Sequence, residues 1–183
     1  MKNLILIIRV MAATVLLVGW AGTSVAQETL VIGQVGDAIT LDPHANNGIV
    51  EASMASNIFD PMIILDKDMA VQPGIAVSWE AKDPVTWNFG IRKGVKFHDG
   101  SDFNADDVVS TFNHLVKKDS GVLTRRNVSW IKNTEKLGNY KIRINLEKPF
   151  PAAFEFLAGP LAIFSSDSWK LRRKTKKASS TMR

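Results

Sequence analysis

The sequence contains no cysteine among its 183 residues. This absence excludes a disulfide scaffold, a thiolate metal site, a cysteine nucleophile and a lipid-anchored N-terminal cysteine. Acidic residues are absent from the first 26 and the last 14 positions, and there are only three histidines. The remaining composition is that of a globular chain, 45% apolar and 22% charged, which excludes a wholly disordered protein.

The formal net charge of +5 is unevenly distributed along the chain. Residues 27–169 carry 14 basic and all 18 acidic residues, so this body has a net charge of −4. The basic excess lies at the two ends. A basic protein invites a nucleic-acid function, but an acidic body with basic ends does not favour one.

The first 26 residues have the pattern of a secretory signal peptide. Lys2 and Arg9 form a positive region, and residues 10–20 are an uncharged, mostly apolar run of 11 residues. A membrane-spanning helix needs about 20 apolar residues, so this run is too short. Small residues before the expected junction suit a signal peptidase. We therefore expect cleavage between Ala26 and Gln27 and a periplasmic location; an uncleaved interfacial anchor is the alternative.

Hydrophobic periodicity predicts an antiparallel sheet. Period-two alternation, typical of half-buried strands with one wet face, occurs in residues 86–92, 95–97 and 141–146. Short apolar runs predict two further strands at residues 30–32 and 62–65.

Two helices are predicted between these strands. Residues 49–59 have helical apolar spacing, and Pro61 ends that helix. The clearer helix begins after Asn104, an N-cap whose partner Asp107 completes a variant capping box, and Gly121 lies just beyond its end.

Catalytic and metal-binding motifs are missing from the sequence. There is no HExxH, GxSxG or glycine-rich phosphate loop, so we expect neither an enzyme nor a cofactor. The acids that follow His98 could be read as a metal site. An Asp99-Gly100 turn and a capped helix explain each acid separately, and we expect no bound metal.

Two features are candidate ligand-binding surfaces. The loop at residues 36–43 follows the first predicted strand, and its Asp37 could hold a cationic group such as a peptide amine; local turn bonding is the alternative. Trp79, Trp87 and Trp130 could line an apolar pocket, although aromatic side chains on a strand face are usually core.

These segments, in this order, resemble the N-terminal part of the family 5 extracellular solute-binding proteins. Residues 72–80 are similar to the family's PGLAESWE stretch, residues 87–100 carry the most specific match, and residues 103–108 resemble its FNADDVV helix start. The resemblance extends over residues 29–169. Gly90 departs from the hydrophobic residue that is usual at its position.

The resemblance implies a mixed α/β fold, namely the N-terminal lobe of a type II (cluster C) periplasmic-binding-protein fold with antiparallel strands and flanking helices. It implies a non-catalytic monomer that hands a peptide or small-molecule solute to a cognate ABC permease in the inner membrane. Nucleic acid is not expected as a partner. Within the lobe, only the loop of Asp37, Ala38, Ile39 and Thr40 matches a cleft-lining position of the family.

The resemblance implies a relationship to two-lobed clamps and covers roughly their first third, so we expect the second lobe to be missing. After Trp169 the chain switches to a basic segment, residues 170–183, which lacks a periodic apolar face and is expected to be disordered. We expect a frameshift or truncated gene near residue 170, and a copy that can be non-functional. The alternative is a small periplasmic interaction or chaperone-like protein built on the same lobe.

Overall fold

The computed structural model describes residues 29–46, 48–120, 122–159 and 161–169. The predicted signal peptide with its Ala26–Gln27 junction, the basic tail 170–183 and Gly121 lie outside the described residues. The chain divides into two units, residues 1–33 and 34–183, and every helix and strand below belongs to the second.

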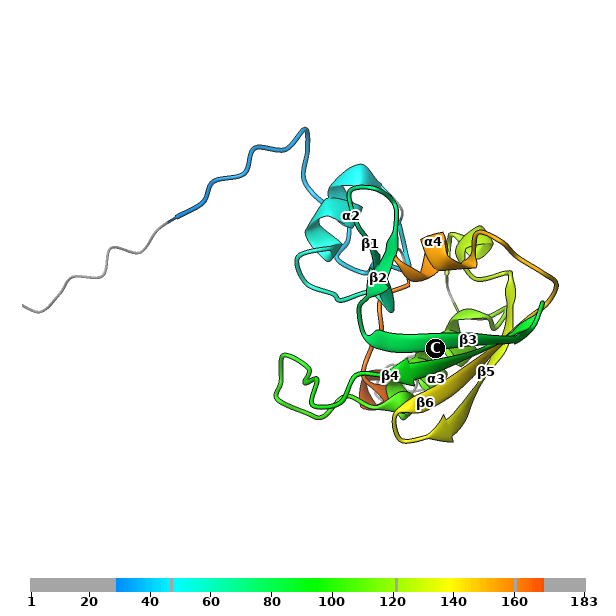
Figure 1. Cartoon of the computed structure of the whole chain (residues 1–183). Coiled ribbons are helices and arrows are strands. Elements are labelled where there is room, and N and C mark those ends of the chain that lie inside the picture. The colour runs from blue at the N-terminus through cyan, green and yellow to red at the C-terminus, as the bar shows by residue number, and fades with distance from the viewer. Residues whose placement is uncertain (1–28, 47, 121, 160, 170–183) are drawn as a thin grey trace, which may run out of the picture. The chain divides into compact units, whose positions relative to one another are not determined.

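A four-stranded antiparallel sheet forms the centre of the second unit (Figure 1). Its strands are β3 (Ala76–Asp83), β4 (Thr86–Ile91), β5 (Ile131–Gly138) and β6 (Lys141–Leu146), in the order β3-β4-β6-β5. Between the central strands, Trp87 is opposite Ile144 and Phe89 is opposite Ile142. Because side chains alternate along a strand, these apolar groups share one face of the sheet.

A second, smaller sheet pairs β1 (Ile63–Leu65) with β2 (Val71–Pro73). In the turn between them, Asp66 Oδ1 accepts hydrogen bonds from the backbone N–H groups of Asp68 and Ala70, both at 2.9 Å. Met69 adopts a φ of 61°, the left-handed conformation that closes this turn. The strand predicted at residues 62–65 is confirmed here.

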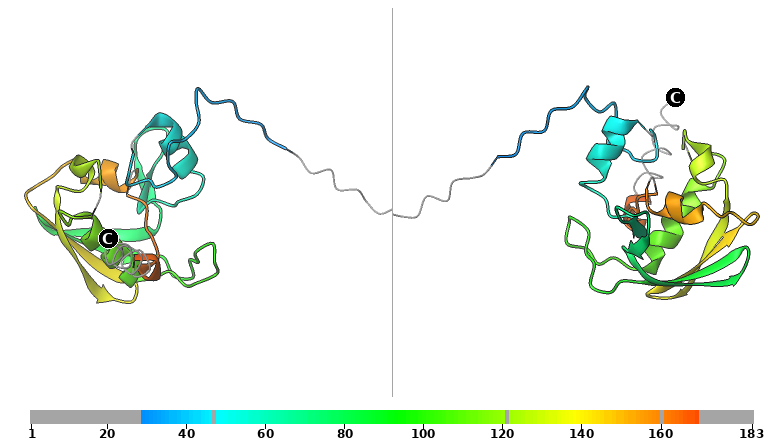
Figure 2. Two further views of the ribbon diagram at one scale, coloured as in Figure 1. Left: turned by 180° about the vertical axis from the view of Figure 1, so that it is seen from behind. Right: turned by 45° about the horizontal axis from the view of Figure 1, so that its top comes forward.

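The helices that accompany the sheets include α2 (Ile49–Ala55), α3 (Ala105–Leu115), the 3-10 turn η1 (Arg125–Asn127) and α4 (Ala153–Leu157). Helix α3 packs on β5 and β6 (Figures 1 and 2). From α4, the Phe154 ring contacts Trp87 and Trp79 edge-on, with ring centroids 5.0 and 5.9 Å apart. Within the described residues, no helix has the length and apolarity needed to cross a bilayer.

The start of α3 confirms the predicted capping box. Asn104 Oδ1 accepts from the Asp106 N–H at 2.7 Å, and Asp107 Oδ2 accepts from the Asn104 N–H at 2.9 Å. The other Asp107 oxygen accepts from the backbone N–H of Ser166 at 2.8 Å. Asp107 is therefore buried as a link between α3 and the segment that follows α4.

Three local predictions are wrong. Residues 30–32 form no strand, and Leu30 and Val31 are more than 80% exposed. A short apolar run becomes a strand only beside a hydrogen-bonded neighbour, and no ladder of the described residues includes it. Residues 95–97 likewise form only one isolated bridge, between Lys96 and Asp102.

The helix predicted at residues 49–59 ends early, at Ala55. The Ser56 hydroxyl and the Asn57 side-chain amide both donate to the Ser53 carbonyl, at 2.8 and 2.7 Å. These local bonds compete with the helical backbone ladder, and the chain tightens into i→i+3 turns before Pro61.

The sheet also corrects the interpretation of two sequence features. The three tryptophans are core residues: Trp130 is 4% exposed and stacks on Phe150, while Trp79 and Trp87 are partly buried and pack against the core. Gly90 lies opposite Ser78 and Lys141, away from the apolar face, so a hydrophobic residue is not needed there for core packing.

Candidate functional site

The predicted ligand loop is held by one carboxylate at the start of α2. The Ile39 N–H donates to Glu51 Oε1 at 3.1 Å, and Asn46 Nδ2 donates to the same oxygen at 3.0 Å. Glu51 is the third residue of α2 and is only 7% exposed. The preceding Gly48 offers no side-chain cap, so Glu51 supplies the acceptor that this short helix otherwise lacks.

These hydrogen bonds lower the pKa of Glu51. The largest cause is the N–H of Ile39, followed by the N–H of Glu51 itself, whereas burial acts in the opposite direction. The ionised carboxylate is therefore the form that fixes the loop to the helix.

Two side chains of the loop, Asp37 and Ile39, are exposed. Asp37 is exposed and its Oδ1 accepts from the Ala38 N–H at 2.8 Å, which is the local turn bond considered as the alternative to ligand binding. Ile39 is 87% exposed, and Thr40 Oγ1 accepts from the Asp42 N–H at 3.1 Å. The backbone of the loop is thus fixed while Asp37 and Ile39 remain accessible to a partner.

A pocket of about 580 Å³ lies beside this loop. Glu51 and Asn46, which hold Ile39, are part of its lining. The rest comes from the loop before α2, α2 itself, the turn before β1, β1, η1 and the segment after α4. Most of it is apolar: Pro43, Ala52, Ala55, Phe59, Pro61, Ile64, Ala158 and Ala162. The volume and mixed lining are those of a small-molecule site.

Two charged residues of this lining, Asp60 and Arg126, are not among the residues that the sequence singled out. They lie 66 positions apart in the chain, on the turn after α2 and on η1. Sequence spacing contains no signal for such an encounter, because the two segments meet only once the sheets and α4 are packed.

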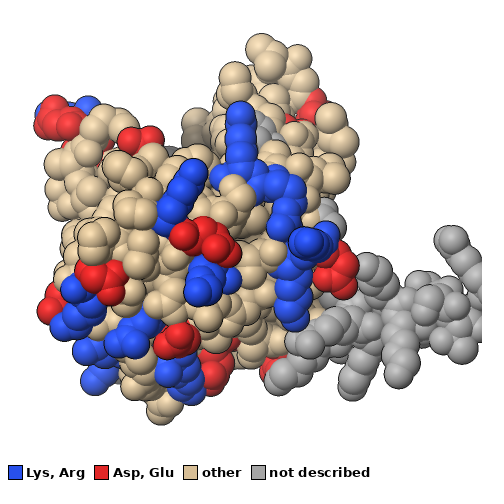
Figure 3. Space-filling view, turned by 90° about the vertical axis from the view of Figure 1, so that its right-hand side faces the viewer, with Lys and Arg blue, Asp and Glu red and all other residues tan. Residues whose placement is uncertain are grey.

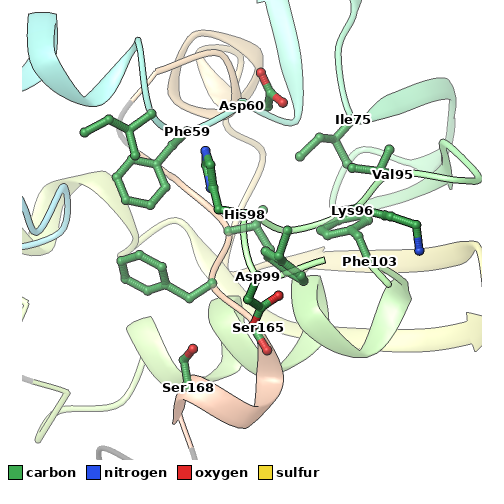
Figure 4. Close-up of a pocket in the computed structure, with 14 residues that line it drawn as sticks. Phe59, Asp60, Ile75, Val95, Lys96, His98, Asp99, Phe103, Ser165 and Ser168 are labelled. Carbon is green, nitrogen blue, oxygen red and sulfur yellow. The ribbon is translucent and has the colours of Figure 1, made fainter. Parts of the chain in front are cut away.

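A second pocket, of about 300 Å³, lies between the turn after α2, the loop at residues 95–99 and the segment at residues 163–168 (Figure 4). His98 lies between Phe59 and Asp60 in this view. Asp99 belongs to a turn: its Oδ1 accepts from the Ser101 hydroxyl at 2.6 Å and from the Ser101 N–H at 2.9 Å. The hydroxyl is the largest cause of the lowered pKa of Asp99.

The acids near His98 therefore have separate structural partners. Asp99 forms its turn, Asp102 pairs with Lys96 at 2.6 Å, and Asp106 pairs with Lys136 at 2.8 Å. In the described part of the chain, no group of three or more histidine and acidic side chains could hold a metal ion.

Charges of both signs are interspersed on the surface. Figure 3 shows lysine and arginine side chains beside aspartate and glutamate on one face of the molecule. Several form exposed pairs, such as Lys82 with Glu80 at 2.6 Å. A nucleic-acid surface instead concentrates positive charge in a patch or stripe.

Comparison with known proteins decides the family. Residues 70–181 match the model of the bacterial extracellular solute-binding proteins, family 5 Middle. The chain belongs to this family. The match includes the Trp87–Gly100 region and the start of α3, which carried the resemblance. The family match therefore confirms the resemblance.

Two curated relatives are similar to this family 5 chain. It is 30% identical over 138 residues to the glutathione-binding protein GsiB of Salmonella choleraesuis, which covers 75% of this chain and 27% of GsiB. It is 34% identical over 97 residues to the periplasmic oligopeptide-binding protein OppA of Escherichia coli K12, which covers 52% of this chain and 18% of OppA.

Solved structures confirm the predicted fold. OppA of Burkholderia pseudomallei superposes with a TM-score of 0.65 at 26% identity, covering 70% of this chain and 28% of that one. AppA of Bacillus subtilis, solved with a nonapeptide, gives 0.68 at 24% identity, with 73% and 27% covered. This family 5 chain spans about a quarter of the length of these structures and matches a single lobe of the type II fold.

Proposed function

We propose that this chain contributes one wall of the solute site in a periplasmic substrate-binding protein. The protein delivers a peptide or a related small solute to a cognate ABC permease in the inner membrane. It acts as a monomer, without catalysis and without a cofactor. The observation that carries the proposal is the anchored loop: in a family 5 chain, buried Glu51 accepts from the Ile39 N–H and also lines a pocket of about 580 Å³.

The arrangement favours binding by a preformed surface. Glu51 and Asn46 fix the loop backbone before any ligand arrives, which reduces the ordering cost of association. Ile39 supplies exposed apolar area, and Asp37 supplies a negative charge suited to a solute amine. The names of GsiB and OppA, which bind glutathione and oligopeptides, support a peptide-like solute.

Export supports the same function. The positive N-terminal region and apolar run of residues 1–26 are typical of a signal peptide, with Gln27 as the first mature residue. A periplasmic location gives the chain access to both the solute and the permease.

The proposal is tested by NMR on the ¹⁵N-labelled chain purified from the periplasmic fraction of an expression host. Millimolar trialanine is expected to shift the amide signals of residues 37–40 and of Glu51, while maltose at the same concentration leaves them unchanged. Asp37→Asn is expected to weaken trialanine binding severalfold, whereas Asp119→Asn, an exposed charge change outside the pocket, has no effect.

Two results would overturn the proposal. One is the absence of any trialanine-induced shift at residues 37–40 across the titration. The other is a set of shifts confined to the pocket around His98, which would place the site there instead.

A further inference from the structure

His44 is a buried titratable residue that joins two distant parts of the chain. It is 6% exposed and lies in the loop before α2. Its Nε2 is 2.9 Å from the carbonyl oxygen of Ala162, 118 positions later in the sequence. Because a carbonyl oxygen only accepts, Nε2 carries the hydrogen of this bond in every ring state that forms it. The proton that the ring gains or loses is therefore the one on Nδ1.

The carboxylate of Asp42 faces this titrating nitrogen. Asp42 Oδ1 lies 3.7 Å from His44 Nδ1, and it accepts from the backbone N–H of His44 at 3.0 Å, which holds the carboxylate beside the ring. The Asp42 side chain is 24% exposed, so solvent and salt screen this pair less than a pair on the open surface. The ring thus lies between a carboxylate and a carbonyl, and only the imidazolium donates to both.

Aromatic rings enclose the imidazole on its other sides. The Phe164 ring contacts it edge-on with centroids 5.0 Å apart, and the centroid of Trp169 lies at 6.3 Å. His114 of α3 stacks on the same indole, with centroids 4.0 Å apart, and is a second titratable group of this cluster. Of the acids on α3 and on the segment after α4, Asp107 accepts from a backbone amide and Asp167 is exposed.

The two segments that His44 joins both line the larger pocket. Pro43, which lies between Asp42 and His44, is part of the lining, and so is Ala162, whose carbonyl accepts the bond. The hydrogen bond from His44 therefore fixes two parts of the pocket wall to each other, although the imidazole itself is not part of the lining.

We propose that His44 is a pH-sensitive positioning residue: its imidazolium holds the loop at residues 42–44 to the segment at residues 161–164, and loss of the Nδ1 proton weakens that link. Burial acts against the charged ring, but the neutral ring turns the lone pair of Nδ1 toward a negatively charged oxygen. An opposite charge within about 4–6 Å favours the charged form of a titratable group.

The sign of the pH dependence follows from this preference. The folded chain binds the Nδ1 proton more tightly than the unfolded chain does. The link is then fully present below about pH 6.5, the ordinary value for an imidazole, and is lost as pH rises through the higher midpoint of the folded chain. The consequence for the pocket rests on the proposed function: solute binding is expected to strengthen as pH falls through this range.

The direct test follows the ring nitrogens of His44 by two-bond ¹H–¹⁵N NMR between about pH 5 and pH 9. The wild-type midpoint is expected above about 6.5, and Asp42→Asn is expected to lower it by about one pH unit, a tenfold loss of proton affinity. This variant keeps a side-chain oxygen for the His44 N–H and removes only the charge. His98→Asn, which removes an exposed histidine, leaves the His44 midpoint unchanged.

A stability measurement gives a second readout. The urea midpoint of unfolding is expected to rise between about pH 8 and pH 6 in the wild-type chain, and to rise less in His44→Gln, whose amide can still donate to Ala162. Asp42→Asn is expected to give the same smaller rise and serves if the glutamine variant does not fold. Glu51 titrates below pH 4.5, outside this window.

The consequence for the solute is measured by NMR titration with trialanine at about pH 6 and pH 8. The gain in affinity at the lower pH is expected to be severalfold larger for the wild-type chain than for His44→Gln. Because the α-amine of the peptide titrates in the same way with both chains, the comparison cancels its contribution. Equal gains for the two chains would overturn the effect of His44 on the pocket.

Failure of this inference is distinguishable from failure of the proposed function. A wild-type His44 midpoint at or below about 6.5, or a midpoint that Asp42→Asn leaves unchanged, would overturn the role of His44. Trialanine-induced shifts at residues 37–40 would then leave the proposed function standing. Absence of those shifts at both pH values, with His44 titrating as expected, would overturn the proposed function and leave the link between the two segments in place.

Discussion

Glu51 is the residue on which the geometry of the candidate site depends. An acid in the first turn of a helix is expected from the helix dipole alone. Here the same carboxylate also accepts from Ile39, twelve positions earlier, and from Asn46. The loop that the family resemblance selected is thus attached to α2 by a residue whose wider role the sequence did not reveal.

The pH dependence of this contact has a defined sign. The folded pKa of Glu51 is below its usual value of 4.5, chiefly because of the Ile39 N–H. The contact is fully present above pH 4.5 and is lost as pH falls through the lower, folded pKa. The amide proton of Ile39 is expected to titrate in NMR spectra with a midpoint below 4.5.

Two variants show whether Glu51 or the nearby Asp37 causes the titration of the Ile39 amide signal. Glu51→Gln is expected to abolish the titration of the Ile39 amide, and Asp37→Asn is expected to retain it. A midpoint at or above 4.5 in the wild-type chain would argue against an engaged carboxylate.

At the scale of elements, α3 shows a cap that also works as a tertiary link. The capping box was predictable because Asn104 and Asp107 are separated by the three positions that such a box requires. The hydrogen bond that Asp107 accepts from the Ser166 N–H was not predictable, because those residues are 59 positions apart in the sequence. One side chain therefore stabilises the start of α3 and holds the later segment against it.

Asp107→Ala is expected to lower the free energy of unfolding by roughly 2–4 kcal/mol, because it removes a cap and leaves the Ser166 N–H without its acceptor. The neighbouring Asp106→Ala, which removes only an exposed pair with Lys136, is expected to cost less than about 1 kcal/mol. Urea denaturation followed by tryptophan fluorescence measures both. Equal losses for the two variants would show that the Ser166 contact contributes nothing.

At the scale of the whole described unit, segments far apart in sequence complete the fold together. His44 Nε2 donates to the Ala162 carbonyl at 2.9 Å, and Thr111 exchanges hydrogen bonds with the backbone of Phe164 at 3.0 and 3.1 Å. Trp169 is 2% exposed and donates from Nε1 to Thr111 Oγ1 at 3.0 Å. The wall of the larger pocket depends on this closure, since Pro43 and Ala162 both belong to it.

Trp169→Ala is therefore expected to destabilise the chain by roughly 3–5 kcal/mol, because a large buried ring is removed. Trp169→Phe keeps an aromatic ring and loses the N–H bond to Thr111, so a cost of about 1–2 kcal/mol is expected. Urea denaturation monitored by far-UV circular dichroism distinguishes them. A cost below 1 kcal/mol for the alanine variant would contradict the packing of residue 169 against α3.

Sequence patterns succeeded where the deciding information is local. Strands β4 and β6 alternate without interruption, and α3 has its own cap, so backbone geometry and neighbouring residues are enough to predict them. Prediction failed at residues 30–32 and 95–97, where an apolar run needed a hydrogen-bonding neighbour that the fold does not provide. Strands β3 and β5, at the two edges of the sheet, were not predicted as strands at all.

The sequence by itself determined the family, the core strands, the start of α3 and the loop at residues 37–40 as a candidate contact. The tertiary structure decided which carboxylate holds that loop and which pocket this carboxylate lines together with Arg126. The physical reason is the sequence separation of the residues that set each feature. Caps and side-chain alternation are set by neighbours a few residues away, whereas a pocket is a meeting of segments that only the packed core brings together.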